Sequence, residues 1–150
     1  YKNISQEYQN WFNGNNENLK FSRHYKKKYK RIDLIKNLNK INSSKNLFIG
    51  IFDIFSKQLI GTITLYIDYK ARTGNIGILI GNKNYFSKGY AVESCRLTIN
   101  YLIKKKIVRS IFAGTKNENL KMINLMKSLK MKKINRRDMQ NVNYMIARLI

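Results

Sequence analysis

Apolar residues recur three or four positions apart in four stretches of the chain, as they do on the buried face of an α-helix. This spacing predicts helices over residues 5–12, 33–41, 91–106 and 120–129. We expect Ser5 to cap the first helix and Asn117 the last, because both side chains accept a hydrogen bond from a helix N–H. The expected buried faces are Tyr8, Trp11 and Phe12; Leu34, Ile35, Leu38 and Ile41; Ala91, Cys95, Ile99, Leu102 and Ile103; and Leu120, Ile123, Met126 and Leu129.

Runs rich in β-branched and aromatic residues lie between these helices and predict strands. The predicted strands cover residues 47–55, 59–68, 75–80, 108–113, 131–134 and 142–150. A helical crossover joins 75–80 to 108–113, so these two strands can be parallel, whereas the last two are expected to form an antiparallel pair. The pattern predicts one α/β domain over residues 1–150, with a mixed, mostly antiparallel sheet and helices on both faces.

The chain is strongly basic, with 30 Lys and Arg against 8 Asp and Glu and a net charge of +22. Residues 25–31, Tyr-Lys-Lys-Lys-Tyr-Lys-Arg, look locally like a nucleic-acid-binding patch, but other basic residues are scattered over every predicted element. An excess of Lys, Asn and Ile without any Pro is also what an AT-rich genome produces. Whether the basic residues serve a function or reflect genome composition, their positive field attracts anionic ligands such as coenzymes, nucleotide sugars or nucleic acid.

Two further features of the composition limit the class of protein. No run approaches eighteen apolar residues, so the sequence predicts no membrane span. The single cysteine, Cys95, cannot form an internal disulfide and fits a cytoplasmic protein.

The segment between the strand at 75–80 and the long helix carries the clearest chemical signal. It reads Asn-Lys-Asn-Tyr-Phe-Ser-Lys-Gly-Tyr-Ala from residue 82 to residue 91. Amides at a helix N-terminus have no partner inside the helix, and they stabilise an anion together with the helix dipole. Gly89 lets ligand and backbone approach closely because it has no Cβ. The loop therefore predicts a phosphorylated cofactor, although Gly89 could also do no more than start a helix.

The order of elements and three motifs resemble the GNAT acetyltransferase superfamily over nearly the whole chain. Residues 86–91, Phe-Ser-Lys-Gly-Tyr-Ala, are similar to the acyl-CoA pyrophosphate loop of its ribosomal-protein N-acetyltransferase branch. Asn119, eleven residues before Lys130-Met131, matches the Asn that precedes a Gly-Phe pair in that branch. Residues 6–13 with 21–23 resemble its Tyr-x-x-Trp-Leu-Asn opening, especially in members that acetylate amino sugars for surface polysaccharides. The family's first strand, which normally precedes this opening, is missing.

The resemblance implies that the strands 75–80 and 108–113 splay apart and admit the pantetheine arm of acetyl-CoA. Backbone groups of three strand residues would pair with its amides, unless these residues are only sheet core: Ile78, Leu79 and Ile80. The loop would hold the pyrophosphate through Phe86, Ser87, Lys88, Gly89, Tyr90 and Ala91. Asn119 would be a further cofactor contact, the alternative being a helix cap. Acceptor contacts are expected from Asn13, Arg23, Tyr66 and Asp68, with Arg23 suited to a phosphate or carboxylate.

Catalysis requires a neutral amine, donors for the developing oxyanion and a proton for the leaving thiolate. Many members of the family carry a Glu on the strand and a Tyr on the last helix, but this sequence has Gly74 or Asn75 and Met126 there. His24 is the only histidine and is the candidate general base, the alternative being an exposed side chain beside the basic run. Without a conventional acid, the reaction would depend on positioning and a water-relayed proton.

The leading hypothesis is a cytoplasmic, metal-independent N-acetyltransferase that uses acetyl-CoA and acetylates a nucleotide-linked amino sugar, with a homodimer left open. An enzyme that acetylates a protein N-terminus or a small amine is the alternative within the same class. Two alternatives are not enzymes: a nucleic-acid-binding module built around residues 25–31, and an inactive member of the family.

Overall fold

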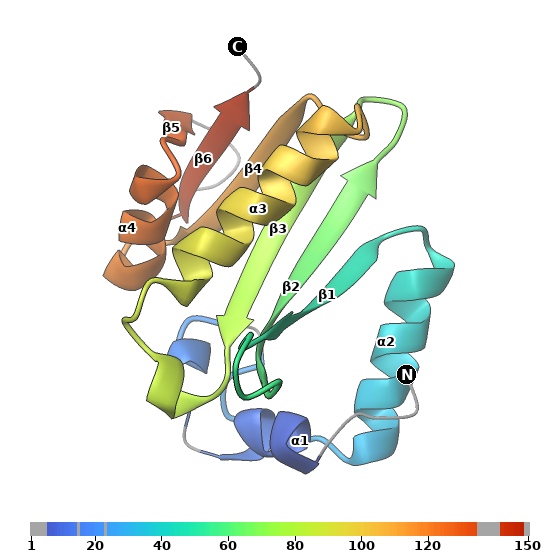
Figure 1. The fold of residues 1–150 in the computed structure, drawn as a ribbon, viewed down its shortest axis with the longest axis vertical. Helices are drawn as coiled ribbons and strands as arrows, with labels where there is room; N and C mark the ends of the chain where they lie inside the picture. The colour runs from blue at the N-terminus through green and yellow to red at the C-terminus, as the bar shows by residue number, and fades with distance from the viewer. Residues whose placement is uncertain (1–5, 15, 23, 135–141, 149–150) are drawn as a thin grey trace. The chain divides into compact units, whose positions relative to one another are not determined.

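A computed structural model describes residues 6–14, 16–22, 24–134 and 142–148 (Figure 1). The chain forms two compact units, in which strands β2 (Leu59–Asp68) and β3 (Thr73–Ile80) pass from one unit to the other. The first unit consists of Tyr1–Thr64 with Ile78–Lys88, and the second of Leu65–Gly77 with Gly89–Ile150. None of the helices in the described part of the chain is long and apolar enough to cross a bilayer.

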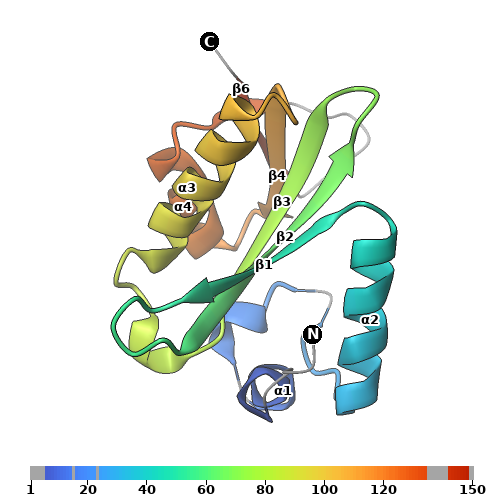
Figure 2. The same ribbon diagram turned by 45° about the vertical axis from the view of Figure 1, so that its right-hand side comes forward.

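The first unit is built around aromatic residues of its N-terminal helix. It contains α1 (Gln6–Asn13), η1 (Glu17–Leu19), α2 (Arg31–Ser43), β1 (Leu47–Phe52) and η2 (Lys83–Tyr85). The helix α2 is in contact with β1, the strand that follows it in the chain (Figure 2). The predicted apolar face of α1 is buried, and the Tyr8 ring meets those of Trp11 and Phe12 edge to face. Leu34 and Leu38 of α2 pack into the same cluster, which closes the core of this unit.

The second unit contains α3 (Tyr90–Lys104), β4 (Ser110–Lys116), α4 (Leu120–Ser128), β5 (Lys132–Ile134) and β6 (Val142–Arg148). The helices α3 and α4 contact each other, and α4 contacts β4 (Figure 1). Its core includes three residues from the predicted face of α3, which are Cys95, Ile99 and Leu102.

The strands follow the order β1-β2-β3-β4-β6-β5. β3 and β4 are parallel, β4 and β6 are antiparallel, and so are β5 and β6. A mixed α/β sheet with one parallel pair and flanking helices was predicted from the sequence and is confirmed.

The predicted ends of one strand and one helix were wrong, because hydrogen bonds from nearby side chains determine where these elements end or begin. The first strand stops at Phe52, three residues before the predicted end, since Asp53 Oδ1 accepts hydrogen bonds from both N and Oγ of Ser56, each at 2.7 Å. The second helix begins at Arg31, because the Asp33 carboxylate accepts a hydrogen bond from Lys30 N at 3.1 Å.

Two predictions for the last helix were also wrong. Its N-cap is Asn119 and not Asn117, and Leu120 is 66% exposed although the apolar spacing placed it on the buried face. Leu120 is the first residue of the helix, so its side chain lies beyond the part that packs. The Ser5 cap predicted for α1 lies outside the described residues.

Candidate functional site

The turn at the start of α3 has the backbone geometry of an anion-binding site. Gly89 is the N-cap, with φ 85° and ψ −13°, a left-handed conformation that glycine adopts without strain. No side chain caps the helix, and its first hydrogen bond runs from Glu93 N to Gly89 O over 3.1 Å. Because the amides of a first helical turn have no intrahelical acceptor, this turn can receive an anionic ligand.

The space next to this turn is open. A Cβ built on Gly89 would meet nothing within 4 Å, and Ser87, Lys88 and Gly89 are all exposed. Phe86 differs from them, since its N–H donates to Lys83 O at 3.1 Å and closes η2. Phe86 therefore shapes the loop through its backbone, while the exposed residues after it leave room for a ligand.

Both strands of the parallel pair continue beyond their paired residues, and β4 runs on to Lys116. Parallel pairing with β4 covers 73–75 and 110–112, whereas β3 runs on to Ile80. Ile80 O accepts a hydrogen bond from Asn18 Nδ2 at 3.1 Å, so one of its acceptor positions is occupied from within the first unit. Leu79 packs against the aromatic cluster of that unit. Backbone pairing of Ile78, Leu79 and Ile80 with a pantetheine arm stays a prediction.

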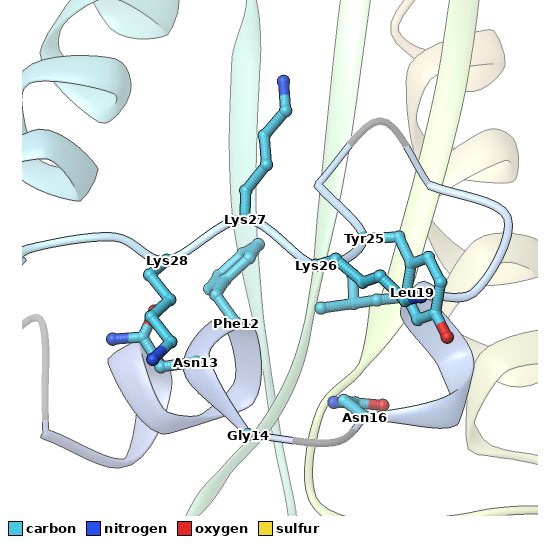
Figure 3. Close-up of a pocket in the computed structure, with 9 residues that line it drawn as sticks. All are labelled: Phe12, Asn13, Gly14, Asn16, Leu19, Tyr25, Lys26, Lys27 and Lys28. Carbon is cyan, nitrogen blue, oxygen red and sulfur yellow. The ribbon is translucent and has the colours of Figure 1, made fainter.

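A pocket of about 150 Å³ lies in the first unit, in the region from which acceptor contacts were expected (Figure 3). The lining residues come from the end of α1, from η1 and its cap, and from the segment after His24: Phe12, Asn13, Gly14, Asn16, Leu19, Tyr25, Lys26, Lys27 and Lys28. None of these nine lining residues carries a carboxylate, so the charged groups around the pocket are all positive.

His24 stands beside this pocket within an aromatic group. Its Nδ1 lies 2.7 Å from Tyr29 Oη, and its ring meets the Phe12 ring edge to face at 5.6 Å. These contacts hold the imidazole in one orientation, as a base that acts at a fixed atom requires. The structure gives His24 a defined place, and its part in catalysis stays a prediction.

Residues 5–132 match the family model described as acetyltransferase (GNAT) domain. The chain belongs to the GNAT acetyltransferase family. It is accordingly an acetyl-CoA-dependent N-acetyltransferase, as the resemblance predicted.

Solved structures of GNAT enzymes share the fold at low identity. An acetyltransferase of the GNAT family from Bacillus anthracis has a TM-score of 0.74 and 21% identity, with 94% of this chain and 90% of that one covered. Ribosomal-protein-S5-alanine acetyltransferase from Vibrio fischeri gives 0.71 and 16%, covering 93% and 85%. Spermidine N-acetyltransferase from Vibrio cholerae, in complex with CoA and spermine, gives 0.67 and 23%, covering 82% and 78%. No curated protein sequence matches.

Asn119 has a structural role that accounts for an asparagine at this position even if it binds no ligand. Its Oδ1 accepts from Met122 N at 3.2 Å and its Nδ2 donates to Thr115 Oγ1 at 2.8 Å, so it caps α4 and ties the helix to the end of β4. The additional contact of Asn119 with the cofactor stays a prediction.

The other expected acceptor residues have different surroundings. Asn13 exchanges two hydrogen bonds with the Tyr29 backbone, at 2.7 and 2.8 Å, and lines the pocket. Asp68 Oδ1 accepts from Ala71 N at 2.9 Å and so stabilises the turn that follows β2. Tyr66 is 41% exposed on β2. Arg23 lies outside the described residues.

Two features bear on the chemistry of this GNAT site. Met126, which stands where many members of the family carry a tyrosine acid, is fully buried in α4 and supplies no proton donor. In the described part of the chain, no three His, Cys, Asp or Glu side chains gather as metal ligands would.

Sequence reasoning missed the contribution of Lys26 and Lys28 to a pocket, although their segment was noticed. The sequence of the run 25–31 indicates only a nucleic-acid patch. A run of lysines in a sequence does not show which apolar residues of another segment lie under it, and here these are Phe12 and Leu19.

Proposed function

We propose that this GNAT enzyme acetylates the amine of a nucleotide-linked amino sugar, in the cytoplasm, with acetyl-CoA as donor. The observation that carries the donor site is the open, left-handed Gly89 turn at the start of α3. The acceptor follows from the amino-sugar-like opening of the chain and from its net charge of +22, which favours an anionic molecule. The residues for pyrophosphate binding are Ser87, Lys88, Gly89, Tyr90 and Ala91, with Phe86 shaping the loop.

In the proposed reaction the amine nitrogen attacks the thioester carbonyl, the bond from carbonyl carbon to sulfur breaks, and CoA leaves as a thiol. The nitrogen loses one proton and the thiolate gains one, so the balance needs no redox partner. His24, or a water that it orients, accepts the proton from the amine. A backbone N–H on β3 donates to the carbonyl oxygen as negative charge develops there.

The second candidate acceptor is a small amine or a protein N-terminus. It is favoured by the folds of the spermidine and ribosomal-protein acetyltransferases reported above. A polyamine is itself a cation, however, and a chain of charge +22 with lysines around its acceptor-side pocket repels it. Electrostatic repulsion of a polyamine therefore supports the proposal of a nucleotide-linked amine as the acceptor.

The test compares acceptors by thiol release from acetyl-CoA. A 4-amino-4-deoxy sugar linked to UDP is expected to react with a higher kcat/KM than spermidine or a peptide with a free N-terminal alanine. Cys95 does not disturb the assay, because it is the only cysteine and burial raises the pKa of its thiol to about 12. Faster acetylation of the peptide or of spermidine would overturn the acceptor assignment.

A further inference from the structure

The pocket of the first unit has the size of a site for one chemical group. Its volume is about 150 Å³, whereas pockets that enclose a whole drug-sized ligand have roughly 300–1,000 Å³. The floor is apolar and nearly closed to solvent, because Phe12 and Leu19 are 9% and 5% exposed. A ligand group that enters it is therefore held by the polar rim.

The rim carries positive charge in a defined arrangement. In Figure 3, Lys26 lies beside Tyr25 and Lys28 extends toward Asn13, while Lys27 extends away from the other labelled residues. Lys26 Nζ lies 5.5 Å from the centroid of the Tyr25 ring, which keeps the ammonium near the pocket. The three lysines line the pocket, and of their side chains Lys26 and Lys28 extend toward other lining residues, whereas Lys27 does not.

The segment that carries these lysines is fixed against α1. Asn13 donates to Tyr29 O and accepts from Tyr29 N, and Gln9 Nε2 donates to the same carbonyl at 2.9 Å. At the other end, Lys27 N donates to His24 O at 3.2 Å. Because the backbone on both sides of Lys28 is held, little conformational entropy remains to be lost when an anion binds.

We propose that this pocket binds a phosphate group of the acceptor, with Lys26 and Lys28 as the donors. The inference rests on the proposed function and names the group by which the acceptor is recognised. Lysine suits phosphate as a point charge with several N–H donors. The Tyr25 ring, 39% exposed at the rim, offers a stacking face to the rest of a nucleotide.

The decisive comparison uses three variants with the same change in net charge. Lys26→Gln and Lys28→Gln are each expected to raise the KM for the UDP-linked amino sugar about tenfold, because each removes one charge-assisted hydrogen bond. Lys27→Gln is the matched control and is expected to change the KM less than about twofold, since its side chain extends away from the pocket. The affinity for acetyl-CoA should stay unchanged in all three.

A binding measurement separates this inference from the acceptor assignment. Calorimetry with UMP, in the presence of saturating CoA so that the Gly89 turn is occupied, should show binding to the wild type and to Lys27→Gln but weaker binding to Lys28→Gln. Equal effects of all three substitutions would mean that UMP is attracted by the positive charge of the surface in general and not by the pocket. That result would overturn the inference. If UMP binding depends on Lys28 but no nucleotide sugar is acetylated, the pocket binds phosphate as inferred and the proposed acceptor is wrong.

Discussion

Gly89 combines two properties that substitution can separate, its left-handed backbone and its missing side chain. Gly89→Val should lower acetyl-CoA affinity at least tenfold, since a β-branched residue at φ 85° costs about 1–2 kcal/mol and its side chain covers the amides of the turn. Gly89→Asn is the informative companion, because asparagine tolerates this backbone conformation but still places atoms over the amides. Both dissociation constants can be measured by calorimetry.

The two variants lead to different conclusions about the turn. If the space above Gly89 is where the pyrophosphate lies, both substitutions weaken acetyl-CoA binding. Recovery of wild-type affinity in Gly89→Asn would mean that only the backbone conformation matters. Wild-type affinity in both variants would contradict the loop assignment, and thermal unfolding shows whether either variant is merely misfolded.

His24 is tested by the proton that it is proposed to accept. His24→Gln keeps a hydrogen-bonding partner for Tyr29 Oη but cannot take a proton near neutral pH. As a general base contributes roughly 10²–10⁴-fold, kcat should fall by about that factor while the affinity for acetyl-CoA stays constant. The rise of kcat with pH that reports the base should also disappear. A variant with the wild-type rate and pH profile would make His24 a structural side chain.

Individual residues differ in how far their role can be predicted from the sequence. The role of Gly89 was accessible, because the strand, the loop and the helix around it are adjacent in the chain and the constraint is local. The role of Asp53 was not, because its carboxylate ends β1 by bonding to Ser56, and the β-rich run continues past this point. The pocket proposed to bind phosphate could not be predicted for another reason, since Phe12 and Lys28 come to line one pocket only in the folded unit.

At the scale of elements, the start of α4 shows how a cap decides where a helix begins. Asn119→Ala should lower the free energy of unfolding by about 1 kcal/mol, the usual cost of losing a capping side chain. Asn119→Asp is the control, because its carboxylate still accepts from Met122 N but no longer donates to Thr115. Chemical denaturation measures both changes.

The same pair of variants tests the cofactor role predicted for Asn119. If Asn119 acts only as a helix cap, acetyl-CoA affinity should fall only where the free energy of unfolding falls. Asn119→Asp should then keep the affinity of the wild type. Loss of affinity in a variant that is as stable as the wild type would support direct contact with the cofactor. The prediction of Asn117 as the cap from the sequence was wrong, since asparagine suits the position at either residue and only packing of the helix fixes its first turn.

The periodic elements were predicted well because each one carries its own signal. The β2 strand was expected over the residues that it occupies, and three of the five expected apolar positions of α3 are buried. Prediction failed where an apolar residue falls at the end of an element. Leu120 fits the helical spacing and is still exposed, because position within the helix overrides spacing there.

At the scale of the whole molecule, the charge of +22 should appear in the kinetics of the acceptor. An anionic acceptor is attracted over distances that salt screens, with a Debye length of about 10 Å at 0.1 M and about 3 Å at 1 M. The kcat/KM for the UDP-linked amino sugar should therefore fall as KCl rises, whereas kcat/KM for spermidine should rise. The Lys27→Gln variant loses one surface charge but no pocket donor. It should therefore weaken the salt dependence of kcat/KM for the UDP-linked amino sugar only slightly. If kcat/KM for the nucleotide sugar does not depend on salt, the basic residues reflect composition and do not steer the substrate.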